Sequence, residues 1–219
     1  MKRLFVVLLT VLMGLLLIAP GASAYSVSAG DLIKIDYGTG NLNGGGAFNI
    51  YKGNVLMFDT FCVERNEYFS PGNSYYIGSI TNGAVQGGIS GQTSPNFDQI
   101  SSKTAYLYYR WATNVIAHTA ANANALQLAL WSFEGEISGL ESVLAANTTA
   151  LGFISDANTN SNGSLYGVQV LNIYGSYDPK TGIYTGYQQD QLVYNVPEPA
   201  TLLLLGIGLL GIGFLRRKQ

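Results

Sequence analysis

The sequence predicts a mainly β fold with a small helical insertion: an antiparallel β-sandwich or barrel that carries two helices. Three observations predict it. Short β-like runs broken by glycine-rich turns fill residues 25–80, apolar residues at helical spacing begin near residue 101, and strand-like runs return after residue 165. A body of about 170 residues is long enough for one domain with its own core.

The strands of the first half are runs of apolar and β-branched residues. They occupy residues 32–37, 48–51, 55–63 and 75–80, and turn signals separate them at 38–46, 53–54 and 71–73. The run 55–63 is apolar at nearly every position, so we expect it to be covered on both faces.

The helical insertion begins near Ser101, where Ala105, Tyr108, Ala112 and Val115 recur at helical spacing. A second, short and largely buried helix is expected up to about Glu134, with an N-cap at Asn122 or Asn124. We expect a polar loop at 156–164, followed by strands at 165–174, 183–187 and 191–195.

Targeting segments are predicted at both ends of the chain. Residues 1–24 combine Lys2 and Arg3, an apolar run and the small-residue exit Ala22-Ser23-Ala24, as in a secretory signal peptide. Residues 197–219 place an uncharged apolar run before Arg216, Arg217 and Lys218, which predicts a short transmembrane helix with its C-terminus in the cytoplasm. The body is therefore residues 25–196.

The tail resembles the PEP-CTERM sorting signal of Gram-negative bacteria, through Pro197-Glu198-Pro199, the Gly-rich apolar run and the terminal basic residues. The resemblance implies removal of the tail by the membrane peptidase exosortase. It also implies a transient stay in the inner membrane and a final place on the cell surface or in an extracellular matrix of polysaccharide and biofilm. The alternative is an ordinary single-pass anchor.

The charge of the body excludes nucleic acid as a partner. Residues 25–196 hold twelve acidic and six basic side chains, a net charge of 6 − 12 = −6, so a basic patch for DNA or anionic lipid is not expected. Frequent Tyr and Asn suit contact with sugars.

Cys62 is the only cysteine of this exported chain. One interpretation is a small buried hydrophobic residue, the common fate of a free cysteine. Another starts from Gln127, the one polar residue in the helical stretch Ala125 to Trp131, because a buried carboxamide needs partners. A cysteine thiolate can attack a glutamine carboxamide, expel ammonia and leave an internal thioester, a stored electrophile that lasts only where apolar groups such as Phe61 and Trp131 exclude water.

The pair resembles the thioester domains of bacterial surface adhesins. Phe61-Cys62-Val63 matches their first motif, and Gln127-Leu128-Ala129-Leu130-Trp131 matches the second, although Leu126 stands where the family has threonine. The best-known members are sortase-anchored proteins of Gram-positive bacteria. The resemblance implies a Cys62–Gln127 thioester that reacts with a surface amine and leaves a covalent amide.

Other constellations are weaker. Cys62 and His118 suggest the catalytic pair of a thiol hydrolase. Glu134 and Glu136 suggest the carboxylate pair of a glycosidase, but carboxylates two residues apart on a helix point to different faces. We expect Glu134 and Glu136 at a solvated helix end, and Glu64 and Glu67 on the surface. Residues 156–163 resemble part of a calcium loop, yet the glycine register and the closing ligand do not fit.

The predicted function is that of an exported matrix or surface protein. Its Cys62–Gln127 thioester attaches it once to an amine or hydroxyl, on extracellular polysaccharide or a surface protein, without turnover, metal or cofactor. The alternative is a noncovalent structural or polysaccharide-binding matrix protein in which Cys62 only packs.

Overall fold

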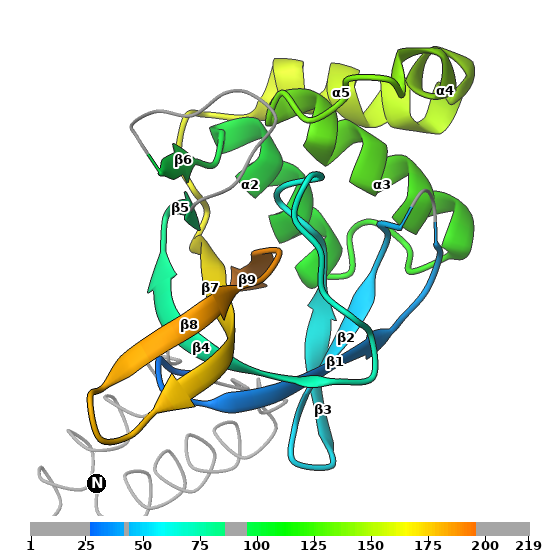
Figure 1. Cartoon of the computed structure of the whole chain (residues 1–219). Coiled ribbons are helices and arrows are strands. Elements are labelled where there is room, and N and C mark those ends of the chain that lie inside the picture. Colours follow the sequence, from blue (N-terminus) through cyan, green and yellow to red (C-terminus); the bar gives the residue numbers. More distant parts are fainter. Residues whose placement is uncertain (1–26, 42–43, 86–95, 196–219) are drawn as a thin grey trace, which may run out of the picture. The chain divides into compact units, whose positions relative to one another are not determined.

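Seven antiparallel strands form an open sheet in the computed structural model, which describes residues 27–41, 44–85 and 96–195 (Figure 1). The sheet order is β3-β2-β1-β4-β7-β8, and β9 also pairs with β7. Its members are β1 (Leu32–Tyr37), β2 (Phe48–Lys52), β3 (Val55–Thr60), β4 (Ser74–Thr81), β7 (Val168–Asp178), β8 (Ile183–Tyr187) and β9 (Gln191–Tyr194). A small second sheet pairs β5 (Gly83–Val85) with β6 (Phe97–Gln99).

The eleven-residue strand β7 organises this sheet, because it pairs along both of its edges. One edge is bonded to β4, while the other is bonded to β9 near Val168–Leu171 and to β8 near Tyr174–Asp178. Most residues of β8 are exposed to solvent, whereas most residues of β9 are buried. The chain between these two strands, residues 188–190, therefore enters the interior.

Four helices lie together beside the sheet (Figure 1): α2 (Ser102–Ala112), α3 (Ala120–Phe133), α4 (Glu141–Ala146) and α5 (Thr148–Asn160). The hydroxyls of Ser101 and Thr119 accept hydrogen bonds from backbone N–H groups in the first turns of α2 and α3, which satisfies donors that a helix start leaves free. Helix α3 lies between two apolar clusters. One holds Leu126 and Leu130, and the other holds Leu128 and Trp131.

The burial of α3 on nearly every side explains its sequence. A helix that is apolar all round belongs inside a protein, and residues 123–131 are buried except Asn124. On the sheet side, the second cluster gathers isoleucines from β1, β2, β4 and β7, namely Ile33, Ile35, Ile50, Ile77 and Ile173.

The mainly β, antiparallel character is confirmed, and the strands expected from the sequence are all present within a few residues. The number of helices is wrong, because α4 and α5 accompany the two that were predicted. The expected loop at 156–164 is wrong in its first half, since α5 runs to Asn160. Only Ala150 and Ala157 of α5 are buried, so it has almost no apolar stripe from which to predict a helix.

Two boundaries differ in ways that affect the site. Strand β3 ends at Thr60, and Cys62 lies beyond it in an isolated bridge with Gln191. Helix α3 begins at an N-cap on Thr119, earlier than Asn122. The expected signal peptide and transmembrane tail lie outside the described residues. Among the described helices, none has the length and apolar character needed to cross a membrane.

Asp190 joins the small sheet to the large one through its buried carboxylate. Its Oδ2 accepts from Val85 N at 2.7 Å and from Asn172 Nδ2 at 2.8 Å, and its Oδ1 accepts from Ile173 N at 3.0 Å. These contacts tie β5 and β7 to the segment that precedes β9.

Replacing Asp190 with alanine should lower the free energy of unfolding by about 3 kcal/mol or more, because it leaves buried N–H donors without an acceptor. Chemical denaturation measures this loss. Asp178→Ala is the matched control: Asp178 also accepts from a backbone N–H and a hydroxyl, but in the exposed turn after β7, so its loss should stay below about 1 kcal/mol. Equal losses in the two variants would contradict the role given to Asp190.

Candidate functional site

Cys62 lies in a segment that is bonded to β9 and is fully buried. Leu192 N donates to Phe61 O at 3.0 Å and Val63 N donates to Asp190 O at 3.1 Å, on either side of the Cys62–Gln191 bridge. Cys62 is 0% exposed. The backbone around the cysteine is therefore held by the same chain segment that carries Asp190.

The side chain of Gln127 is held directly against the backbone of Cys62. Its Oε1 accepts from Cys62 N at 3.2 Å and from Gly46 N at 3.2 Å, while its Nε2 donates to Cys62 O at 2.9 Å. Gln127 is also 0% exposed. The structure thus brings Cys62, in the segment after β3, and Gln127, in the middle of α3, into contact.

The thiol of Cys62 contacts two further buried glutamines. Its Sγ donates to Gln189 Oε1 at 3.0 Å and accepts from Gln191 Nε2 at 3.7 Å. Burial raises the pKa of the Cys62 thiol. The neutral thiol is therefore the resting form, and it contacts two carboxamides.

Gln189 and Gln191 were not among the residues expected at the site. The signal was present in the run Gln188-Gln-Asp-Gln191, four polar residues directly before an apolar strand. Such a run resembles a solvated turn until the structure shows that the chain turns inward at Gln189.

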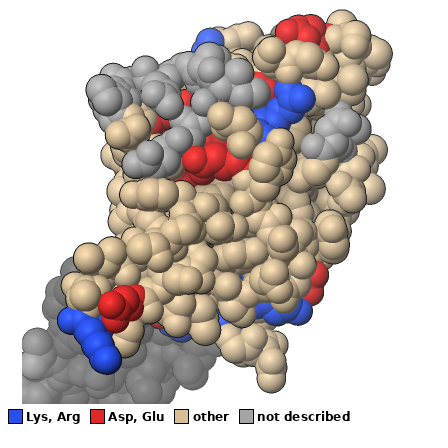
Figure 2. Space-filling model, in the orientation of Figure 1, with Lys and Arg blue, Asp and Glu red and all other residues tan. Residues whose placement is uncertain are grey.

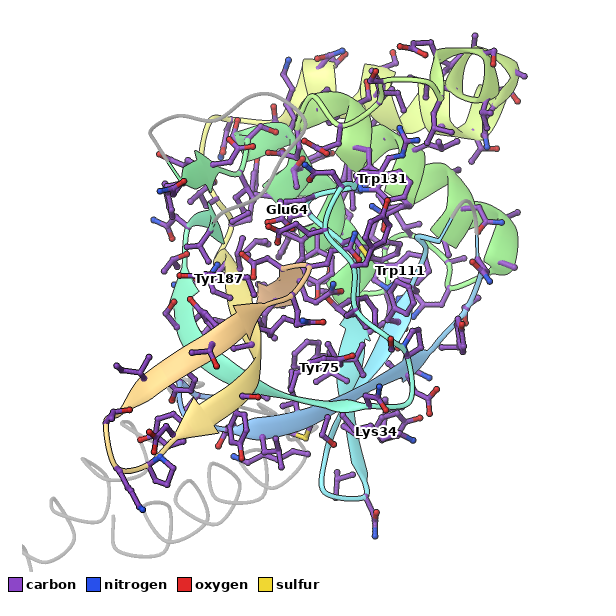
Figure 3. All side chains as sticks on the ribbon, viewed as in Figure 1. Lys34, Glu64, Tyr75, Trp111, Trp131 and Tyr187 are labelled. Carbon is purple, nitrogen blue, oxygen red and sulfur yellow. The ribbon has the colours of Figure 1, made fainter. Side chains whose placement is uncertain are left out.

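Trp131 and the glycine segment 44–46 cover Gln127. Trp131 is 1% exposed, and it shares an apolar cluster with Cys62. A Cβ on Gly45 would lie 2.5 Å from Trp131 Cη2 and 2.7 Å from Gln127 Cγ, so only glycine lets the backbone pass this closely. Figure 3 places Trp131 where the segment after β3 passes α3.

Phe61 points to the other cluster. Its ring packs edge-on against Trp111 at a centroid distance of 5.1 Å and against Tyr108 at 6.2 Å. Neighbouring residues of an extended chain face opposite sides, so Phe61 and Cys62 enter different apolar clusters. A shielding role for Phe61 stays a prediction.

Four glutamates expected at the surface are not there. Glu64, Glu134 and Glu136 are buried, and Glu67 is half-buried. Glu134 Oε1 accepts from Ser101 N at 3.1 Å and Glu136 Oε2 accepts from Arg65 N at 3.0 Å, so both carboxyls are used to hold backbone. Their polar sequence context gave no sign of this burial.

Glu64 and Asp190 form a buried acidic pair next to Cys62. Burial raises the pKa of both carboxyls. Glu64 Oε2 accepts from Asp190 N at 3.0 Å, but its Oε1 has no hydrogen-bond partner among the described residues. Because three N–H groups stabilise ionised Asp190, we assign the proton of the pair to Glu64.

His118 does not meet Cys62. It stacks on Trp111 at a centroid distance of 4.0 Å, and its Nδ1 lies 3.2 Å from Asp59 Oδ2. The thiol bonds Gln189 and Gln191 instead, so the two residues form no Cys–His pair. Asp156 of the suggested calcium loop lies in α5 and pairs with Arg110. In the described part of the chain, no group of three His, Cys, Asp or Glu side chains is placed to hold a metal ion.

The face drawn in Figure 2 is mostly uncharged, with small separate groups of acidic and basic atoms. This agrees with the low content of charged residues, 11% of the chain. The distinctive ionisable groups of this protein are instead the buried carboxyls of Glu64 and Asp190.

Stability should fall as pH rises from about 5 to about 8. Burial, together with Glu136, raises the pKa of Glu67 to about 7, and the same causes raise that of Asp98 to about 6. These carboxyls keep their protons in the folded state after the unfolded chain has lost them, so the folded state binds more protons in this window. Thermal melting across the window measures the fall.

Glu67→Gln should flatten this pH dependence, because it removes one titrating group. Glu141→Gln, at an exposed position of α4, is a control of the same size and charge and should leave the slope unchanged. A melting temperature that rises with pH over this window would contradict the prediction.

The comparisons with known proteins bear on the tail. Residues 195–218 match the PEP-CTERM protein-sorting motif. No curated protein and no solved structure matches the chain. The chain therefore carries the C-terminal sorting signal of an exported protein that exosortase processes.

Proposed function

We propose that this protein is an exported surface or matrix protein that forms an internal thioester between Cys62 Sγ and Gln127 Cδ. The thioester attaches the protein covalently, once, to a nucleophile on a partner surface or in the extracellular matrix. The observation that carries the proposal is the three-point hydrogen bonding of the Gln127 carboxamide to the backbone of Cys62 and Gly46, inside a buried site.

Bond formation releases ammonia. The sulfur attacks Cδ of Gln127, the Cδ–Nε2 bond breaks, and the thiol proton leaves on nitrogen as part of NH₃. In this step negative charge develops on Oε1. The N–H groups of Cys62 and Gly46 already point at that oxygen, which is the arrangement that stabilises an oxyanion.

Cys62 is a free, buried cysteine in the structure. Sγ donates to Gln189 Oε1, so it must exchange this contact for Cδ of Gln127. Its backbone is already fixed against the carboxamide, and such positioning lowers the entropic cost of the attack. Both residues are unexposed, which supports protection of the bond from water.

The alternative is a noncovalent matrix protein in which Cys62 only packs. It is supported by the same contacts, because the hydrogen bonds of Gln127 already satisfy most of its carboxamide without any covalent bond. Mass separates the two functions.

Protein that has been exported and never exposed to added amines should be lighter than its sequence by one molecule of ammonia. Intact-mass spectrometry measures the deficit, and Cys62→Ala and Gln127→Ala should each abolish it. Gln189→Ala is the matched control, since it removes a different carboxamide next to the same thiol and should leave the deficit in place. A wild-type mass equal to the mass calculated from the sequence would rule out the thioester.

Trp131→Ala should form the thioester and lose it to water faster than wild type, because the cover over Gln127 is gone. The truncation also lowers the free energy of unfolding by about 3 to 5 kcal/mol, so the control must be a variant with a similar loss of stability. Trp111→Ala supplies it: Trp111 is 0% exposed but belongs to the cluster of Phe61. Mass followed over time on folded protein should show faster loss in Trp131→Ala alone. Equal rates would leave Trp131 as a core residue only.

A further inference from the structure

A pocket of about 260 Å³ opens beside the Cys62–Gln127 site. Its described lining consists of Tyr37, Asn41, Gly44, Phe48, Arg65, Tyr68, Phe69, Pro71, Trp131 and Gln189. The volume is just below the range of about 300–1,000 Å³ that encloses drug-sized ligands, so the pocket has room for a single ring-sized group.

Two wall residues connect the pocket to the site. Gln189 lines the pocket and accepts the hydrogen bond of the Cys62 thiol. Trp131 also lines it and lies one helical turn after Gln127, and neighbouring Gly45 packs against both. A ligand in this pocket is therefore one side-chain layer away from the proposed thioester.

The lining combines aromatic rings with a cation. Five of its members are Tyr, Phe or Trp, and Phe48 and Phe69 pack edge to face at a centroid distance of 4.8 Å. Tyr68 is 77% exposed and stands at the rim. Such rings offer flat apolar surfaces with polar edges, which suit the C–H faces and hydroxyls of a sugar ring.

Arg65 sets the charge that the pocket selects. It is the charged residue of the described lining, and its guanidinium is anchored by Glu136 O and Ser138 O. Carboxylates are bound by guanidinium in a bidentate manner. A lysine ammonium would instead meet a like charge. The described lining itself contains no carboxylate, and the Glu136 carboxylate beside it is bound to the backbone N–H of Arg65.

We infer that this pocket binds an acidic saccharide, a sugar unit that carries a carboxylate, and that such a saccharide is the target of the protein. Binding itself needs no thioester. The covalent step rests on the proposed function. In that step the intervening wall side chains move aside, a sugar hydroxyl oxygen attacks Cδ of Gln127, the S–Cδ bond breaks, and the hydroxyl proton ends on Cys62 Sγ. The product is an ester on residue 127 and a free thiol.

The binding test uses the exported Cys62→Ala protein, which has no thioester, and a trigalacturonate probe followed by calorimetry. Saturable binding is expected, and it should exceed that of maltotriose, a neutral sugar of the same length, by about tenfold. Tyr68→Ala in the same background should weaken it by about tenfold. Tyr187→Ala, at an exposed ring on β8 outside the pocket, should not.

Arg65→Gln tests the charge, with thermal melting to show that the variant is folded. It should remove the preference for trigalacturonate over maltotriose while leaving weak binding of both. Absence of saturable trigalacturonate binding would overturn the inference, as would equal affinities in the Tyr68→Ala and Tyr187→Ala variants.

The covalent arm mixes wild-type protein with trigalacturonate or with Nα-acetyl-lysine methylamide and measures intact mass. An adduct heavier by one whole trigalacturonate supports the inference. If the lysine probe forms an adduct with protein that shows the ammonia deficit, and trigalacturonate does not bind, the inference is overturned but the thioester is supported. Saturable trigalacturonate binding by wild-type protein with no ammonia deficit supports the saccharide site and rules out the thioester.

Discussion

The buried carboxamide of Gln127 holds helix α3 to the chain segments on either side of it, at Gly46 and at Cys62. Helix α3 is apolar on nearly every side and packs between two cores. Its single buried carboxamide would be costly there without partners. The backbone of Cys62 and Gly46 supplies them. The position of α3, the glycine segment 44–46 and the conformation of Cys62 all follow from this requirement.

A polar layer continues from that point into the sheet. Gln189, Gln191, Glu64 and Asp190 surround Cys62 and replace the water that these groups would otherwise bind. Asp190 is satisfied by N–H donors from two strands, whereas Glu64 retains a buried oxygen without a described partner. Protonation of Glu64 lowers the cost of burying two acids together. The same layer surrounds a neutral thiol whose pKa is raised by burial, and burial of this kind lowers the thiolate fraction on which cysteine reactivity depends.

Trp131 connects the proposed Cys62–Gln127 bond to the neighbouring pocket. Trp131 faces Gln127 through the glycine segment on one side and lines the pocket on the other. An apolar cover that protects a thioester from water and a pocket that brings a nucleophile to it would then share one side chain. The sorting signal at residues 195–218 adds that such chemistry would occur outside the cytoplasm, where a chain with a single cysteine has no disulfide partner of its own.

The strands, the first two helices and the tail motif could be predicted from the sequence, because each depends on local periodicity or on a short ordered motif. The sequence motifs also predicted that Gln127 and Cys62 would lie together, and hydrogen bonds join the Gln127 carboxamide to the Cys62 backbone. The sequence could not show α5, whose two buried alanines make no apolar stripe. Nor could it show that Gln189, Glu64 and Glu136 are buried, since polar residues in a turn-like context have the same local pattern whether the turn faces solvent or the core. The tertiary structure decided those positions, and with them the partners of the thiol and the pocket beside it. Burial depends on which segments distant in sequence pack over a residue, and no local pattern encodes that.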